Sequence, residues 1–170
     1  MLLSLLFLLC ACGHEPPTPS VTTTSPNAKV CTVSIRCDTI LDHMADLNEA
    51  KKAFVPEDGL LLTDVPMEIF AGDTVYTILR RACDEHACQA DCDFRKSGIQ
   101  MEASQTPGFG MDAYYVQGIH QLYEKDCGPR SGWMFLVNGQ IPDVGAGMYS
   151  VQDGDKIQWV YTCNWGEDIQ

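Results

Sequence analysis

The segment SGWMFLVNG, residues 131–139, limits the fold more narrowly than any other stretch of the chain. Within it, Trp133 and Phe135 alternate with Met134 and Leu136, as residues on the two faces of a β-strand do. Both faces of this strand are therefore apolar. Such a strand is either central in a sheet or exposes one face as a binding surface.

Turn signals bound the strands in the C-terminal half of the chain. Asn138-Gly139 is the dipeptide most typical of a tight hairpin turn, and it directly follows the strand above. A second turn, VQDGD at residues 151–155, precedes KIQWVYT at residues 156–162. Alternation in that last segment predicts a strand with Ile157 and Trp159 on one face.

The N-terminal part of the domain predicts two further strands. VCTVSIR, residues 30–36, alternates between polar and apolar residues, which is typical of a half-buried strand. Residues 60–70 are extended in character, and Pro66 favours a place at the edge of a sheet because proline cannot donate a ladder hydrogen bond.

One main helix is predicted from about residue 75 to about residue 87. Either Asp73 or Thr74 can cap its first turn. Its apolar residues recur at helical spacing and form a single face: Val75, Ile78, Leu79 and Ala82. One helix among several short strands indicates an α+β fold, and we expect a β-grasp-like mixed sheet packed on that helix. In a β-grasp the first and last strands lie side by side and parallel.

The charge of the chain disfavours two classes of partner. The 170 residues carry a formal net charge of −12, with 23 Asp plus Glu against 11 Lys plus Arg. An acidic surface repels phosphate backbones, so nucleic-acid binding is not expected, and direct docking of basic residues on anionic lipid is disfavoured too.

Residues 1–11 are predicted to be a signal peptide. The run Leu2–Leu9 is almost wholly apolar, too short to span a bilayer but long enough for the apolar core of a signal. The LCAC motif at residues 9–12 resembles a bacterial lipobox, which makes Cys12 the lipidated first residue of the mature protein. An ordinary cleaved signal and a buried N-terminal helix are the alternatives.

Residues 12–29 form a tether rich in proline, threonine and serine, with too few apolar side chains for a core. A lipidated cysteine, then a tether, then a folded domain over residues 30–170 is the layout of a surface lipoprotein. A diacylated, N-modified cysteine can hold a protein at a membrane. We therefore expect an extracytoplasmic protein, lipid-anchored to the bacterial cell membrane, whose only covalent group is the lipid at Cys12.

Nine cysteines in 170 residues indicate disulfides or a metal site. Seven remain once Cys10 and Cys12 are assigned to the signal and the lipid. If the first and last strands are adjacent and parallel, Cys37 and Cys163 come within disulfide range. The other candidate pairs are Cys83 with Cys127 and Cys88 with Cys92, which leaves Cys31 unpaired.

A zinc site is the rival interpretation of the cysteines. Cys83, His86, Cys88 and Cys92 provide four soft ligands within ten residues. No CxxC pair is present, however, and His86 is also placed to cap the helix end, so no metal is expected.

Four segments occur together in the order typical of one family. They are GDTV at 72–75, YVQGI at 115–119, SGWMFLVNG at 131–139 and DGD at 153–155. On these segments the chain resembles, over about residues 30–166, the bacterial domain-of-unknown-function family described as transcobalamin-like C-terminal. Those domains are similar to the smaller, β-grasp domain of the cobalamin carriers intrinsic factor and transcobalamin.

The resemblance implies a binding or surface-display module without known catalytic residues. In the carriers, the equivalent of the Trp133 strand and its neighbours faces the corrin ring. The residues expected to bind a flat ligand here are Tyr115, Trp133, Phe135 and Tyr149. The carriers use a large α/α-barrel domain for half of their site, and this sequence has no counterpart, so modest affinity is expected unless a partner closes over the ligand.

The sequence thus predicts a membrane-anchored, extracytoplasmic module that binds cobalamin or another corrinoid. The alternative is a structural or adhesive surface module that binds protein or glycan. Motifs that pair a nucleophile with a base, or that hold a catalytic metal, are not found in the sequence, and an enzyme is not expected.

Overall fold

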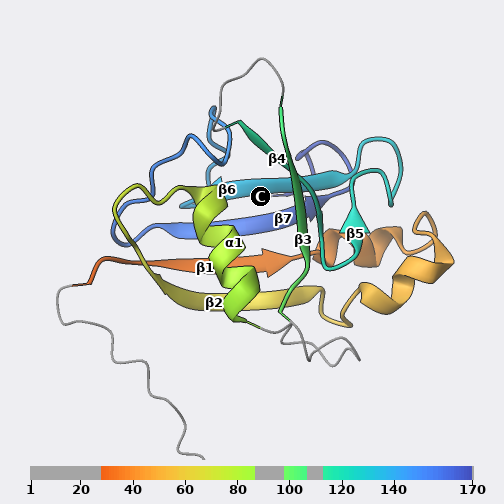
Figure 1. Cartoon of the computed structure of the whole chain (residues 1–170). Coiled ribbons are helices and arrows are strands. Elements are labelled where there is room, and N and C mark those ends of the chain that lie inside the picture. Colours follow the sequence, from red (N-terminus) through yellow and green to blue (C-terminus); the bar gives the residue numbers. More distant parts are fainter. Residues whose placement is uncertain (1–27, 87–97, 107–112, 170) are drawn as a thin grey trace, which may run out of the picture.

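The computed structural model describes residues 28–86, 98–106 and 113–169. Two sheets and one α-helix form the fold (Figure 1). Along the chain the elements are β1 (Val30–Arg36), the 3-10 helices η1 (Asp38–His43) and η2 (Glu49–Phe54), β2 (Leu60–Glu68), α1 (Val75–Glu85), β3 (Met101–Gln105), β4 (Tyr114–Ile119), β5 (Leu122–Tyr123), β6 (Gly132–Val137) and β7 (Lys156–Thr162).

The larger sheet has the strand order β2-β1-β7-β6. Its central strands β1 and β7 run parallel, with Ile35 opposite Trp159, which confirms the side-by-side first and last strands of a β-grasp. The outer strands are antiparallel to their neighbours. Pro66 lies in the edge strand β2 opposite Thr32, as its missing N–H predicts.

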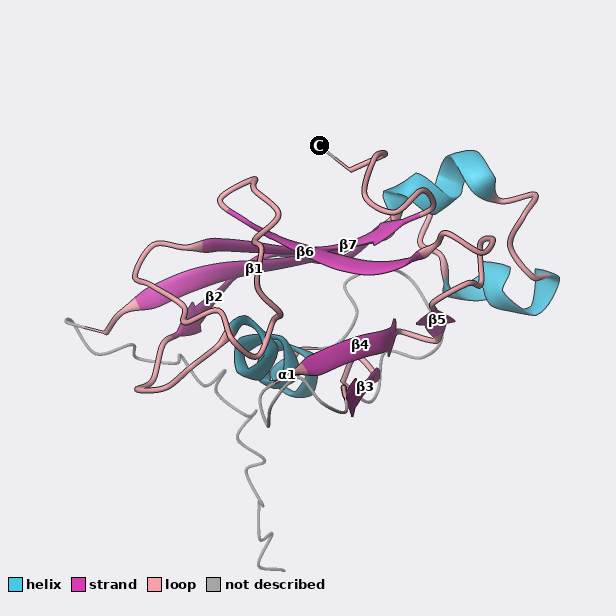
Figure 2. Cartoon of the chain, turned by 90° about the horizontal axis from the view of Figure 1, so that it is seen from above, coloured by secondary structure: helices cyan, strands magenta, loops and turns pink. Residues whose placement is uncertain are grey.

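A second, smaller sheet of β3, β4 and β5 was not predicted. It lies with α1 on one side of the larger sheet, as the view from above shows (Figure 2). The strand β5 has only two residues, too few for any alternation to appear in the sequence. A tight turn at His120 and Gln121, both with positive φ (53° and 64°), folds β5 back onto β4.

The core lies between the larger sheet and the layer of α1 and the small sheet. Ile78 and Leu79 of the helix are fully buried, and so are Val33 and Ile35 of β1. Burial of an aliphatic side chain of this size contributes about 1.5–3 kcal/mol, so this face of α1 fixes the helix on the sheet.

The start of α1 confirms one of the two predicted caps. Thr74 accepts a hydrogen bond from the Thr77 N–H, and the Thr77 hydroxyl accepts one from the Thr74 N–H, which is a capping box. Asp73 instead accepts hydrogen bonds from the Phe70 N–H and from Arg81. The helix ends at Glu85, two residues before the predicted end.

The Asn138-Gly139 turn forms, but it does not join two sheet strands directly. It links Val137 to Gln140 by two backbone hydrogen bonds (2.8 and 3.0 Å), and residues 141–155 intervene before β7. The Asn138 side chain accepts from the Lys156 N–H and donates to Asp155. The dipeptide therefore ends β6 and also holds the start of β7.

The opposite face of the larger sheet is partly covered by the segment that follows β7 (Figure 2). Ile169 packs there on Leu136 and Val160 in a small cluster of its own. The Asp168 carboxylate holds this segment in place because it accepts hydrogen bonds from the Thr162 hydroxyl and the Cys163 N–H. None of the helices in the described ranges is long and apolar enough to cross a membrane.

Replacement of Gly59 by alanine is expected to destabilise the fold strongly. Gly59 has φ +70°, and an added Cβ would lie 2.4 Å from the Asp38 Cα. Backbone strain and this clash together predict a loss of about 3 kcal/mol or more in urea denaturation.

Gly139→Ala is the matched control for this variant. Gly139 has a similar φ of +77° but no atom within 4 Å of the added Cβ. The free energy of unfolding should fall by only about 1 kcal/mol, which is the cost of holding alanine at a positive φ. Equal losses in the two variants would contradict the close approach of Gly59 to Asp38.

Candidate functional site

The structure places Trp133 in the core rather than on a surface. Its side chain is 5% exposed, and its indole N–H donates to the Leu122 carbonyl (2.8 Å). Its ring meets Tyr161 edge-on, with ring centroids 5.3 Å apart. The expectation of an exposed Trp133 is therefore wrong, because β5 supplies a cover for this end of β6 that the sequence did not reveal.

The other three predicted aromatic residues differ in their surroundings. Phe135 is half-buried against Trp159 on the core face of the sheet. Tyr149 is half-buried as well. Tyr115 is 43% exposed, and its hydroxyl donates to Glu124 (2.9 Å). Partial burial and the carboxylate of Glu124 raise the pKa of Tyr115 to about 12.

These predicted residues do not meet on one surface. The Tyr115 hydroxyl lies close to Gly132, which pairs with Thr162 at the end of β7. Tyr149 lies toward the opposite end of that strand, because Gln152, three residues later, donates its N–H to Asp155 (2.8 Å), which directly precedes β7. Seven strand residues span about 20 Å, so the Tyr115 hydroxyl and Tyr149 lie toward opposite ends of β7.

A different pair of aromatic residues forms the best candidate site. Tyr76 of α1 and Tyr114 of β4 stack with ring centroids 4.0 Å apart and an interplanar angle of 3°. They line a pocket of about 610 Å³, which we call the tyrosine pocket. Its lining consists of Gly72, Thr74, Tyr76, Thr77, Arg80, Tyr114, Gly147, Met148 and Ser150.

The loop of residues 146–150 is tied to the start of α1 and completes this pocket. The Tyr76 N–H donates to the Ala146 carbonyl (2.9 Å) and the Val75 N–H to the Tyr149 carbonyl (3.2 Å). These bonds occupy N–H groups that a helix start otherwise leaves unpaired, so they are not available to an anion. The same loop presents the Met148 side chain, which is 56% exposed.

The chemistry of the tyrosine pocket suits a flat ligand with a polar rim. The two aromatic rings and the Met148 thioether offer apolar, polarisable contacts. Arg80 lies one helical turn after Tyr76 and brings a guanidinium to the lining, where it can donate to carbonyl oxygens of a ligand.

Tyr76 was missed by the sequence analysis. It lies beside the apolar stripe of α1 rather than within it, and a tyrosine at such a position was the available signal. The aromatic density of residues 114–115 was visible, but the contact with Tyr76 spans 38 residues and depends on the unpredicted small sheet.

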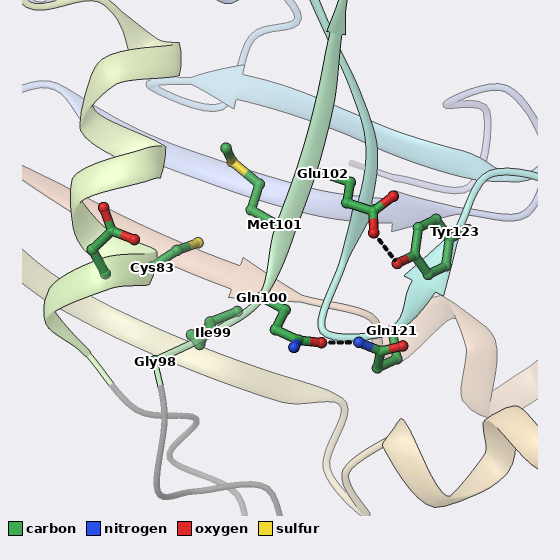
Figure 3. A pocket seen from close by; sticks show the side chains of 9 residues that line it. Cys83, Gly98, Ile99, Gln100, Met101, Glu102, Gln121 and Tyr123 are labelled. Carbon is green, nitrogen blue, oxygen red and sulfur yellow. Dashed lines mark hydrogen bonds between the residues drawn. The ribbon is translucent and has the colours of Figure 1, made fainter.

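A second pocket of about 490 Å³ lies between α1, β3 and the start of β5, and it is more polar (Figure 3). Its polar groups largely satisfy one another. The Tyr123 hydroxyl donates to Glu102 (2.8 Å), and Gln121 is hydrogen-bonded to Gln100. The Tyr123 ring also contacts Gly118 and the ammonium of Lys51, so this pocket offers a flat ligand less than the tyrosine pocket does.

Residues 72–163, more than half of the chain, match the family model described as "Domain of unknown function (DUF4430)". The chain belongs to this family. No curated protein sequence matches it significantly.

Two solved structures are similar in fold. Haptocorrin in complex with Cbi superposes with a TM-score of 0.50 at 16% identity, over 83% of this chain and 26% of that chain. A protein from Ruminococcus gnavus ATCC 29149, described as a candidate metal binding protein, gives a TM-score of 0.43 at 12% identity, over 79% of this chain and 96% of that chain. The chain thus spans about a quarter of the haptocorrin. At this identity the likeness shows the fold, and with the family match it confirms the resemblance to a transcobalamin-like domain.

The four residues of the rival zinc interpretation are only partly described. Cys83 is buried within the core, where burial raises its pKa to about 12, with a further contribution from Asp84. His86 caps the end of α1. Cys88 and Cys92 lie outside the described residues, as do the predicted signal peptide, Cys12 and nearly all of the tether. The described ranges contain no cluster of three or more potential metal ligands.

Two of the predicted disulfide pairs are not formed. Cys83, Cys127 and Cys163 are thiols. The register of β1 on β7 ends with Arg36 opposite Val160, so continuing it by one residue leaves Cys37 two residues short of Cys163. That offset separates the Cα atoms of Cys37 and Cys163 by about 8 Å, beyond the range of a disulfide. The pairing was wrong because strand adjacency was predicted without its register.

Trp133→Phe tests the structural role assigned to this residue. The variant leaves the Leu122 carbonyl without its donor and opens space in the core, so it should lose about 2 kcal/mol or more in urea denaturation. Tyr115→Phe is the control, because it removes an exposed hydroxyl and should change stability by less than about 0.5 kcal/mol. A neutral Trp133→Phe would contradict the buried hydrogen bond.

Proposed function

We propose that the chain is a binding module that holds cobalamin or another corrinoid at the tyrosine pocket. The observation that carries this proposal is the stacked pair Tyr76–Tyr114 beside the exposed Met148. The shared fold with part of haptocorrin, solved in complex with Cbi, supports it. We propose no catalytic role.

The ligand fits this pocket by its shape and its rim. A corrinoid has a flat ring system with amide side chains around its edge. Tyr114 and Met148 are placed to contact the ring, and Arg80 to donate to an amide carbonyl. A pocket of about 610 Å³ covers only part of so large a ligand, so the affinity of this domain by itself should be modest.

We also propose that the module works outside the cytoplasm, anchored by a lipid on Cys12. Support comes from the apolar run of residues 2–9, the lipobox-like LCAC motif and the proline-rich tether. The net charge of −12 makes a lipid anchor a more effective membrane attachment than the protein surface.

An adhesive module that binds a protein partner is the alternative. It is favoured by exposed apolar side chains on the face of the larger sheet opposite α1. Trp165 is 70% exposed near Arg130, and Ile141 is exposed close to Gly166. Residues of this kind are frequent at protein–protein interfaces.

Titration with cobalamin and with cobinamide tests the ligand. We expect a change in the visible spectrum and quenching of tryptophan fluorescence at sub-millimolar ligand. Tyr114→Ala and Met148→Ala should each weaken binding by about tenfold, because each removes contact area worth about 1–2 kcal/mol. Tyr115→Ala, in the same strand, is the matched control and should bind normally. No spectral or fluorescence change with either ligand up to about 1 mM, roughly the weakest dissociation constant of specific binding, would refute the corrinoid proposal. That result would favour the adhesive module.

The anchor is tested by fractionation of a bacterial host that expresses the full chain. The wild-type protein should collect in the membrane fraction, and Cys12→Ser should be released from it because the lipid cannot be attached. Cys10→Ser is the matched control and should stay with the membrane. Membrane association that survives Cys12→Ser would contradict a lipid anchor at this residue.

A further inference from the structure

Two buried thiols lie near each other at the end of β7, outside the lining of both pockets. Cys127 lies in the loop between β5 and β6, and Cys163 follows β7 directly. Their side chains are 4% and 9% exposed, and each thiol contributes to the pKa of the other, as two neighbouring groups do. Both are reduced in this structure.

The fold holds the Cys127 loop firmly against β7. The Tyr161 hydroxyl donates to the Tyr123 carbonyl (2.7 Å) and lies 3.0 Å from the Ser131 hydroxyl. The Ser131 hydroxyl in turn accepts from the Cys127 N–H (3.1 Å). Cys163 lies two residues beyond Tyr161, so it faces the same loop.

The 3-10 helix η1 closes the third side of this thiol pair. The Cys127 thiol donates to the His43 carbonyl (3.4 Å), and the Thr39 hydroxyl donates to the Tyr161 carbonyl. The pair is thus enclosed by three segments that are distant in sequence.

We propose that Cys127 and Cys163 are the cysteines of the described domain that oxidise to a disulfide, which closes the chain from residue 127 to residue 163. This replaces the pairings of Cys37 with Cys163 and of Cys83 with Cys127. The inference rests on the packing of the two thiols and does not depend on the corrinoid proposal.

The reaction is thiol–disulfide exchange with a low-molecular-weight disulfide such as oxidised glutathione. The thiolate of one cysteine attacks the glutathione disulfide, forms a mixed disulfide and releases one glutathione thiolate. The second cysteine then attacks the protein sulfur of the mixed disulfide and releases the other glutathione thiolate. The two cysteine protons pass to the two glutathiones, so two thiols are oxidised and one disulfide is reduced.

The reaction should be slow in the folded protein. Burial raises the pKa of Cys163 to about 12 and also raises that of Cys127, so few thiolates are present at neutral pH. In an oxidising compartment even a slow reaction leads to the disulfide, whereas a reducing compartment keeps both cysteines as thiols.

Peptide mapping of the full chain identifies the partners directly. After incubation of the reduced, folded protein with oxidised glutathione, free thiols are blocked and the chain is cleaved with trypsin. The peptide of residues 126–130 should then be linked to that of residues 157–170. Tryptic cleavage leaves Cys31 in residues 30–36, Cys37 in residues 37–51, and Cys83 in residues 82–95 together with Cys88 and Cys92, so a link to any of these peptides gives a mass different from that of the expected pair.

Thermal denaturation measures the effect of the disulfide on the stability of the domain. Oxidation should raise the Tm by about 5–10 °C, and a reductant should reverse this, because a closed loop of this length constrains the unfolded chain. Cys127→Ser and Cys163→Ser should each abolish both the linked peptide and the rise in Tm, whereas Cys31→Ser should keep both.

Linkage of the Cys37 peptide to the Cys163 peptide, linkage of the peptide that holds Cys83 to the Cys127 peptide, or full recovery of blocked thiols at both positions would overturn the assignment. The wild-type map decides this even if a serine variant does not fold. Because Cys163 follows the last residue of β7, whereas the loop of residues 146–150 precedes β7 and is bonded to the start of α1, corrinoid binding at the tyrosine pocket should be the same before and after oxidation. A failed corrinoid titration and a failed crosslink therefore identify different errors.

Discussion

The parallel pairing of β1 with β7 is the constraint on which the rest of the structure depends. It joins the two ends of the folded domain, with Ile35 beside Trp159 in the centre of the sheet. Parallel strands cannot be joined by a tight turn, so the intervening chain must cross the sheet and return. That crossing supplies α1 and the small sheet, which together cover one face of the larger sheet and leave the tyrosine pocket between them.

Periodic patterns of apolar residues in the sequence predicted the longer strands and the helix of this fold. The alternation of residues 30–36 and 156–162 and the helical stripe from Val75 to Ala82 each correspond to an element of the structure. The sequence patterns did not predict elements that are too short to show a period. The strand β5 has two residues, and the turn before it depends on positive φ values at His120 and Gln121, which favour glycine and are not signalled by these residue types.

The same limit explains why the burial of Trp133 was not predicted. Alternation correctly assigned Trp133 and Phe135 to one face of β6, but it does not say what lies on that face. The Leu122 carbonyl of β5 lies on that face and accepts from the Trp133 indole N–H. No sequence pattern had predicted β5. The stack of Tyr76 on Tyr114 likewise requires α1 and β4 to be neighbours, which is a property of the topology rather than of either segment.

The cysteines show the difference between adjacency and register most clearly. Adjacent parallel strands were predicted, and Cys37 and Cys163 do lie at the same end of them. A shift of two residues is enough to prevent a bond, because each residue advances about 3.3 Å along a strand. The partner that we propose for Cys163 depends instead on the Tyr161 hydroxyl, which fixes the loop that carries Cys127. A disulfide in such a fold is therefore selected by the hydrogen bonds that position a loop, and strand order by itself is not sufficient to assign it.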